Sequence, residues 1–522
     1  MIHKFKHPLS LSLIFLIAAG MRLPHLSLRP MHTDEAVHAV KFGALLENGS
    51  YQYDPVEYHG PTLYFFTWIL AKTTGQDSLQ DVTDSTLRMV PVLFGILLIG
   101  FTFWLVPGLG WPAILTAGLL TALSPAFVFY SRYYIQEILL VCFTTGWITS
   151  SYRYLTSEKW GWIILSGIFF GLMHATKETS IITWWAAGSA LLILWLLRNG
   201  FYPSFRKPSK RMWTHLTVFV VAGAITSTAL FSNGFTYPKG ILDSFSTYAN
   251  YFFKAGQNSL HNHPSCYYFQ HLFCYQSGEQ FWSEWPILLF AIMGLIRIFH
   301  SGRKFSKGNP LHQFIALYAI LLTAVYILIP YKTPWSMLSF YHAWILLAGM
   351  GFIAFLDWTA KSKLLKTSAF VLLVIGTSHL AYQAWTANFK CQSSPANPYV
   401  YAHPTEDVFK ISNTIQSLMD EQSLPIHVIV SNHEYWPLPW YLRNLENIGW
   451  YADIPDDWTP APVLLFSEEF KEPIIKKLYV DAKPGERDLY VPLFDKELEL
   501  RPGQPVLGYI RYDVLNRISN HK

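Results

Sequence analysis

His32-Thr33-Asp34-Glu35-Ala36-Val37-His38 stands where the first apolar run of the chain gives way to a polar segment. Two adjacent carboxylates at the end of a membrane span are energetically costly, and residues of this kind usually have a function. We expect Thr33 to cap a helix over residues 36–46, with Asp34 and His38 one turn apart on the same face. The acids could simply complement the helix N-terminus. Alternatively, Asp34 could be a catalytic carboxylate at the mouth of a membrane cavity.

The composition is typical of a polytopic membrane protein. Of the 522 residues, 51% are hydrophobic and only 14% are charged, whereas soluble domains carry about 25% charged residues. The apolar residues occur in runs of about 20 without charge, which is long enough to cross a bilayer. The net charge of +5 therefore reports on membrane topology and does not indicate nucleic-acid binding.

Hydropathy predicts a polytopic α-helical body with about 11 transmembrane helices. No small-residue cleavage site follows the first apolar run, so we expect that span to be retained, with its basic N-terminal end in the cytoplasm. The basic loops at 153–159, 198–211, 297–307 and 361–366 then all fall on the cytoplasmic side, as the positive-inside rule requires of an inner (plasma) membrane protein. The expected spans are 8–28, 86–106, 112–130, 135–155, 160–176, 180–198, 213–232, 285–300, 311–329, 338–357 and 367–386.

The predicted topology divides the chain into a membrane domain, 1–386, and a C-terminal domain, 387–522. The first outer loop, 29–85, contains a short apolar helix opened by Pro61, which we expect to lie in the membrane interface. After residue 386 the long apolar runs stop and charge rises. Helical and strand-like segments then alternate, which predicts an α/β domain on the extracytoplasmic side. These segments are an amphipathic helix at 405–419, strands at 426–430 and 463–466, and a short helix at 436–443.

Five polar clusters fall on the predicted outer face. Their cations are suited to binding a phosphate, and their acids to taking a proton from an acceptor. For Glu137 and Glu178, pairing with a neighbouring cation and a role in catalysis remain equal alternatives. The candidate catalytic residues are Asp34 and Glu35. The candidate substrate-binding residues are His38, Glu57, His59, Arg132, Tyr133, Glu137, Lys177, Glu178, Lys332 and Trp335.

The ordered set of motifs resembles that of the GT-C glycosyltransferases. Asp34-Glu35 in the first outer loop resembles the carboxylate motif of this superfamily. The wider pattern resembles the dolichyl-phosphate-mannose protein mannosyltransferase (PMT)-like branch, which includes the lipid A aminoarabinose transferases. Within that branch, the chain is similar to the prokaryotic flippase-activity-associated glycosyltransferase group. The motifs that carry this resemblance are His32 to His38, Tyr58-His59-Gly60-Pro61-Thr62, Arg132-Tyr133, Lys177-Glu178 and Trp436-Pro437-Leu438-Pro439-Trp440-Tyr441.

The resemblance implies a GT-C fold and an inverting sugar transfer. A mannose-like sugar, or another hexose or pentose, would pass from a polyprenyl-phosphate donor to an extracytoplasmic protein, lipid or glycan. Carried over by position, Asp34 would be the base or the acid that orients the acceptor, and Glu35 and His59 would shape the site. The cations Arg132, Lys177 and Lys332 would hold the lipid phosphate.

The resemblance implies no cofactor and favours a mechanism without metal, because basic side chains can stabilise a phosphate leaving group. Asp34, Glu35 and Glu57 could nevertheless form an oxygen-rich site for a divalent ion. The alternative function is a transporter or flippase component for lipid-linked sugars. Transporters often consist of repeated halves, and the sequence shows no matching halves, which argues against this alternative.

Cys266 and Cys274 lie in a predicted outer loop, where an oxidising environment favours a disulfide between them. Cys391 is a rival partner, and two packed free thiols are the alternative.

Overall fold

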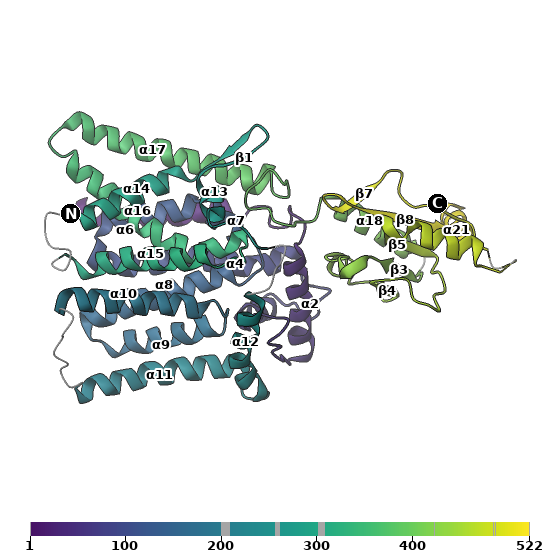
Figure 1. Ribbon diagram of the computed structural model, residues 1–522, viewed down its shortest axis with the longest axis horizontal. Coiled ribbons are helices and arrows are strands. Elements are labelled where there is room, and N and C mark those ends of the chain that lie inside the picture. The colour runs from purple at the N-terminus through teal and green to yellow at the C-terminus, as the bar shows by residue number, and fades with distance from the viewer. Residues whose placement is uncertain are drawn as a thin grey trace. The chain divides into compact units, whose positions relative to one another are not determined.

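The computed structural model describes residues 2–199, 209–255, 261–300, 308–421, 423–483, 485 and 487–520. The chain forms two compact units whose boundaries cut across the sequence (Figure 1). The membrane unit comprises Met1–Leu26, Asn48–Gly75 and Ser85–Tyr401, and the α/β unit comprises Ser27–Glu47, Gln76–Asp84 and Ala402–Lys522. The first outer loop is therefore divided between the two units, and residues 387–401 belong to the membrane unit.

The membrane unit is built from helices, and each predicted span coincides with a helix or with a bent helix pair. Among the described residues, six helices are long and apolar enough to cross a membrane, or seven if the bent pair is one span. The number of eleven spans therefore stays a prediction. The elements are α1 (Ile2–Arg22), α3 (Thr62–Thr73), α4 (Asp84–Thr102), α5 (Val106–Leu109), α6 (Trp111–Leu123), α7 (Pro125–Ser131), α8 (Glu137–Ser157), α9 (Trp160–His174), α10 (Ser180–Asn199), α11 (Lys210–Phe231), α12 (Lys239–Ala255), α13 (Tyr267–Phe273), β1 (Tyr275–Ser277), β2 (Gln280–Trp282), α14 (Trp285–Phe299), α15 (Pro310–Leu328), α16 (Leu338–Trp358) and α17 (Lys363–Trp385).

One predicted span, 112–130, is broken into α6 and α7, which are bent by 60° at Ser124. Pro125 opens α7 and cannot donate a backbone hydrogen bond, so the ladder is interrupted there. Two fully buried charged side chains bind the backbone groups that have no helical hydrogen-bond partner at the break. Arg22 donates to the carbonyls of Thr121 (3.0 Å) and Ala122 (2.9 Å).

The second of these side chains is Glu284, which lies just before α14. Its carboxylate accepts hydrogen bonds from the Ser124 hydroxyl (2.6 Å) and the Ala126 N–H (2.9 Å) at the start of α7. The hydroxyls of Tyr341 (2.9 Å) and Tyr399 (2.8 Å) supply two more. Four donors thus compensate this carboxylate without a cation, and the break in α6–α7 is stabilised from both sides.

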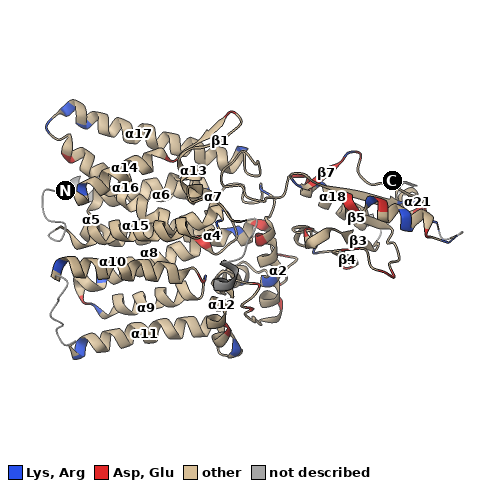
Figure 2. Ribbon diagram, in the orientation of Figure 1, with Lys and Arg blue, Asp and Glu red and all other residues tan. Residues whose placement is uncertain are grey.

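Basic side chains gather at one end of the membrane unit. Figure 2 shows Lys and Arg at the helix ends on the side where the N-terminus lies. Two exposed ion pairs lie among these loops, Arg211–Glu158 at 2.8 Å and Arg297–Asp357 at 2.7 Å. Parts of two predicted basic clusters, 200–208 and 301–307, lie outside the described residues. The described part of the distribution agrees with the positive-inside pattern expected from the sequence.

The α/β unit contains a mixed sheet, as the alternating pattern predicted. The strand order is β4-β3-β5-β8-β6, and β7 also pairs with β8. Strand β3 is parallel to β4 and β5, whereas β8 is antiparallel to β5, β6 and β7. The elements are α2 (Thr33–Asn48), α18 (Asp407–Glu421), β3 (Ile426–Ile429), α19 (Leu438–Tyr441), β4 (Ile448–Tyr451), β5 (Val463–Ser467), α20 (Lys471–Ile475), β6 (Tyr490–Pro492), β7 (Leu498–Arg501), β8 (Gln504–Arg511) and α21 (Tyr512–Asn520).

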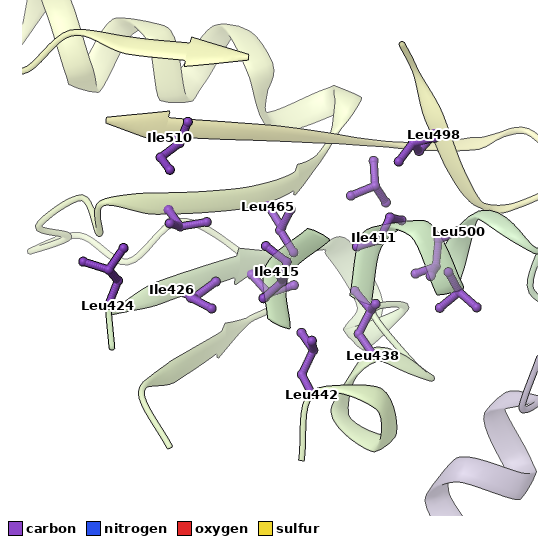
Figure 3. Packing of buried hydrophobic residues seen from close by; sticks show 14 of the residues in the cluster. Ile411, Ile415, Leu424, Ile426, Leu438, Leu442, Leu465, Leu498, Leu500 and Ile510 are labelled. Carbon is purple, nitrogen blue, oxygen red and sulfur yellow. The ribbon is translucent and has the colours of Figure 1, made fainter. Parts of the chain in front are cut away.

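The core of this unit lies between the sheet and α18. Figure 3 shows Ile411 and Ile415 of α18 packed with Ile426, Leu465 and neighbouring aliphatic side chains. These positions alternate along β3 and β5 and recur at helical spacing along α18. Burial of these side chains, worth roughly 1.5–3 kcal/mol each, holds the helix on the sheet.

The disulfide predicted between Cys266 and Cys274 is wrong, since both are exposed free thiols. The intervening residues form helix α13. Eight residues of helix separate two Cα atoms by about 12 Å, beyond the roughly 7 Å limit that a disulfide can bridge.

Candidate active site

The helix that carries the acidic pair begins at Thr33. Hydrogen bonds that involve His32 and Glu35 cap its N-terminal end. The Asp34 N–H donates to His32 Nδ1, and the His32 N–H donates to Glu35 Oε2, both at 3.0 Å. His32 therefore caps the helix in place of Thr33. Burial lowers the pKa of His32. Because its Nδ1 accepts a hydrogen bond, the ring is neutral and carries its proton on Nε2.

The two adjacent carboxylates have different surroundings. Glu35 is fully buried and lies 3.7 Å from the guanidinium of Arg29, in addition to binding the His32 N–H. The Asp34 side chain is 44% exposed, and its carboxylate lies 3.8 Å from His32 Nδ1. Glu35 is thus held as part of the helix cap, whereas Asp34 presents its carboxylate to solvent. On the same helix His38 is buried.

The motif Tyr58-His59-Gly60-Pro61-Thr62 packs against the turn between α9 and α10 in the membrane unit. The Thr62 N–H donates to the carbonyl of Ala175 at 3.1 Å. A Cβ at Gly60 would collide with that carbonyl, so glycine allows the close approach. Pro61 precedes α3 as predicted, while Glu57 lies exposed in the preceding turn.

This approach brings His59 against Glu178. His59 Nδ1 donates to Glu178 Oε2 at 2.7 Å, and the Tyr53 hydroxyl donates to Oε1 at 3.2 Å. Burial opposes ionisation of Glu178, but the interaction with His59 outweighs it and lowers the pKa of the carboxyl. Glu178 is therefore an anion at neutral pH.

Lys177 is buried beside this carboxylate and forms an ion pair with Glu137. Burial opposes its charge, but the Glu137 carboxylate, assisted by Glu178, raises the pKa of Lys177. The pairing with a neighbouring cation, one of the two alternatives, is confirmed for Glu137. Glu178 instead forms its hydrogen bond with His59, and a role of either acid in catalysis stays a prediction. The turn between α9 and α10 and the start of α8 thus bring one buried cation together with two buried acids.

The other predicted phosphate ligands bind backbone carbonyls in this structure. Arg132 donates to Pro24 (2.6 Å) and His25 (2.9 Å), and its guanidinium lies 4.8 Å from the ring centre of Phe389. Lys332 is buried and donates to the carbonyl of His263 at 3.1 Å. Each cation therefore also fixes an outer loop.

Tyr133 and Trp335 lie together, with ring centres 5.8 Å apart. Within the described part of the chain, no group of three or more His, Cys, Asp or Glu side chains is arranged to hold a metal ion.

Comparison with known proteins relates this arrangement to membrane sugar transferases. Residues 58–231 match the model of the dolichyl-phosphate-mannose-protein mannosyltransferase family. The fold is similar to that of ArnT from Cupriavidus metallidurans bound to undecaprenyl phosphate, with 13% identity and a TM-score of 0.62 over 95% of this chain and 97% of that one. It is also similar to archaeal oligosaccharyltransferase AglB from Archaeoglobus fulgidus in complex with an inhibitory peptide and a dolichol-phosphate, with 12% identity, a TM-score of 0.53, and 90% and 70% of the two chains covered.

The chain has the GT-C fold. The resemblance expected from its motifs is confirmed at that level. A comparison with curated protein sequences gave no match. The family match begins at Tyr58, so it includes the His59–Glu178 and Lys177–Glu137 pairs but not Asp34 or Glu35.

The residues from the C-terminal part of the chain that bind the segment just before the acidic pair were not predicted from the sequence. Arg501 donates to the Thr33 hydroxyl at 2.7 Å, and the Tyr441 hydroxyl accepts from the Met31 N–H at 2.8 Å. The Trp-Pro-Leu-Pro-Trp-Tyr motif did single out Tyr441, but nothing in the sequence paired it with residue 31.

Proposed function

We propose that the chain is a membrane glycosyltransferase that moves a sugar from a polyprenyl-phosphate donor to an acceptor outside the cytoplasm. The observation that carries this proposal is the fold, which covers 95% of this chain and 97% of an ArnT bound to undecaprenyl phosphate. The comparisons lend no support to the alternative of a flippase component. Sugar and acceptor classes stay as broad as the sequence predicts: a hexose or pentose, and a protein, lipid or glycan.

The proposed reaction is a single displacement with inversion. A nucleophilic oxygen or nitrogen of the acceptor bonds to the anomeric carbon, and the bond from that carbon to the phosphate oxygen breaks. The electron pair leaves with polyprenyl phosphate, and Asp34 takes the proton from the acceptor. Support for this role is that Asp34, unlike Glu35, has an exposed carboxylate on a rigid, buried cap.

Lys177 is the residue that we assign to the departing phosphate, with Arg132 and Lys332 as further cationic ligands. A permanently charged ammonium in a buried site stabilises negative charge far better than one in water. The two anions beside Lys177 keep it charged before substrate arrives. His59 and Glu178 would then orient the sugar through hydrogen bonds, and no metal ion is required.

The test is release of polyprenyl phosphate by purified protein supplied with a panel of polyprenyl-phosphate sugars and candidate acceptors. We expect turnover that persists in EDTA and falls by about 10²–10⁴-fold in Asp34→Asn, since a general base contributes that much. Asp457→Asn, which changes an exposed acid of the α/β unit, is the matched control. Near-normal turnover of Asp34→Asn would exclude the base role, and no release from any donor would refute the function.

The proposed topology has the N-terminus in the cytoplasm and the α/β unit outside it. In a Cys266→Ser/Cys274→Ser background, which lacks the two exposed thiols, we expect an impermeant thiol reagent to label Glu468→Cys in intact cells or after outer-membrane permeabilisation. Lys361→Cys, in a predicted inner loop, should react only after the inner membrane is lysed. The reverse labelling pattern would show that the topology is the opposite of the proposed one.

A further inference from the structure

Arg501, at the end of β7, donates four hydrogen bonds through its two terminal nitrogens. Its Nη1 donates to the carbonyl of Glu434 (3.0 Å) and to Gln504 Oε1 (3.1 Å). Its Nη2 donates to the Thr33 hydroxyl (2.7 Å) and to the carbonyl of Trp436 (2.8 Å). Each terminal nitrogen of a guanidinium carries two N–H groups, so all four have an acceptor. A side chain in this state is held in one orientation and is unsuited to binding substrate itself.

The acceptor that matters most is Thr33, because it is the first residue of α2 and precedes Asp34. The other three acceptors lie on the segment around residues 434–436 and on β8. Arg501 therefore joins the start of α2 to the sheet of the same compact unit. Burial lowers the pKa of the Arg501 guanidinium, and the negative charges of Glu434 and Asp34 oppose that lowering in part.

The neighbouring segment fixes the same outer-loop residues at other points. Tyr441 accepts from the Met31 N–H at 2.8 Å. The indole of Trp440, which is fully buried, donates to Asp84 Oδ1 at 2.7 Å. Arg443 donates to the carbonyls of Leu79 (3.1 Å) and Val82 (2.7 Å). Both outer-loop stretches of the α/β unit are thus held by the C-terminal part of the chain.

We propose that Arg501 is a positioning residue for Asp34, acting through the Thr33 hydroxyl, so that the C-terminal domain takes part in sugar transfer by orienting the base. This role rests on the proposed function. General domain packing would explain contacts anywhere on α2, whereas these contacts fall on the residues directly before the exposed acid. A base that is displaced by about 1 Å loses on the order of 10²-fold in rate, so loss of this contact should reduce the chemical step.

The test compares steady-state kinetics of polyprenyl phosphate release in variants at both ends of the contact. Thr33→Val removes the acceptor with little change in volume, and Thr33→Ser keeps it. Arg501→Lys keeps the charge but loses the planar fork. We expect about a tenfold loss of kcat in Thr33→Val, about 10- to 100-fold in Arg501→Lys, unchanged KM for the donor, and near-normal kcat in Thr33→Ser.

The double variant Thr33→Val/Arg501→Lys should lose no more than the worse single variant, since both changes break one contact. Arg511→Gln, which alters an exposed ion-pair network in the same unit, is the matched control for general destabilisation. Wild-type kcat in folded Thr33→Val and Arg501→Lys would overturn the role while leaving the function intact. Additive losses, or a rise in donor KM alone, would also overturn it. No release by the wild-type protein would instead refute the proposed function, and the role with it.

Discussion

Two of the places where the membrane unit buries charge differ in the kind of partner that the charged side chains bind. At the break between α6 and α7, Arg22 binds backbone carbonyls, and Glu284 binds hydroxyls and a backbone N–H. These partners do not titrate in the physiological range, and the charges compensate for a broken hydrogen-bond ladder. This region is saturated, and a ligand would have to displace a structural contact in order to bind there.

At the turn between α9 and α10, the buried charges bind other charged or titratable side chains. Lys177 pairs with Glu137, and Glu178 binds His59. Such a partner can be exchanged for a charged group of a substrate without leaving a backbone group unsatisfied. Of these two places, the turn between α9 and α10 is therefore the better candidate for binding a charged substrate.

The largest expected effect is at Lys177. Lys177→Met should lower donor affinity and also destabilise the protein by about 3–5 kcal/mol, because Glu137 is left as a buried unpaired carboxylate. The double variant Lys177→Met/Glu137→Gln removes that charge, so it should recover stability but not donor affinity. Thermal unfolding and binding of a labelled polyprenyl phosphate measure the two effects separately. Full donor affinity in the double variant would contradict the distinction between the two regions.

A smaller effect is expected at the break. Glu284→Gln replaces an acceptor with a group that also carries N–H donors, and these face donors from Ser124 and Ala126. We expect a loss of about 1–3 kcal/mol in the free energy of unfolding. Donor affinity of the folded fraction should not change. If Glu284→Gln lowered donor affinity as much as is expected for Lys177→Met, the break would be part of the donor-binding site. The distinction between the two regions would then be wrong.

The smallest expected effect is on the stability of the protein at acid pH. The pKa of Glu178 is lowered in the folded state, so its contribution to stability is full above the unfolded pKa, about 4.3 for Glu. That contribution is lost as the pH falls through the folded pKa. Thermal unfolding of the wild type should therefore show a decline below about pH 4.3 that is weaker in Glu178→Gln. Matching profiles for the two proteins would show that the His59 contact contributes nothing to stability.

Hydropathy and helix signals were sufficient to predict most of the fold. The apolar runs, the proline at the start of α3 and the alternating pattern after residue 386 each mark an observed element. The break at Ser124 was not predicted, although Pro125 is a signal for it, because a hydropathy profile does not detect an interruption within one apolar run. The wrong disulfide has a similar origin, since spacing was considered without the helix that forms between the two cysteines.

The site was predictable only in part. Pairing of an acid with a neighbouring cation follows from local charge density, and it was one of the two alternatives for Glu137. The different fates of Asp34 and Glu35 could not be predicted, because neighbouring helical residues differ by about 100° in direction and only the tertiary fold decides which direction is buried. Arg501 was missed for the same reason.

The hydrogen bond between Thr33 and Arg501 joins residues 468 positions apart. During synthesis at about 5–20 residues per second, on the order of half a minute to a minute and a half passes between the two residues. Helix α2 therefore leaves the ribosome long before the strand that holds it. A chain interrupted before β7 contains the acid but lacks Arg501. On the proposed role, one of the last strands to be made brings the first acid of the chain into a working orientation, so chains that end before β7 are inactive.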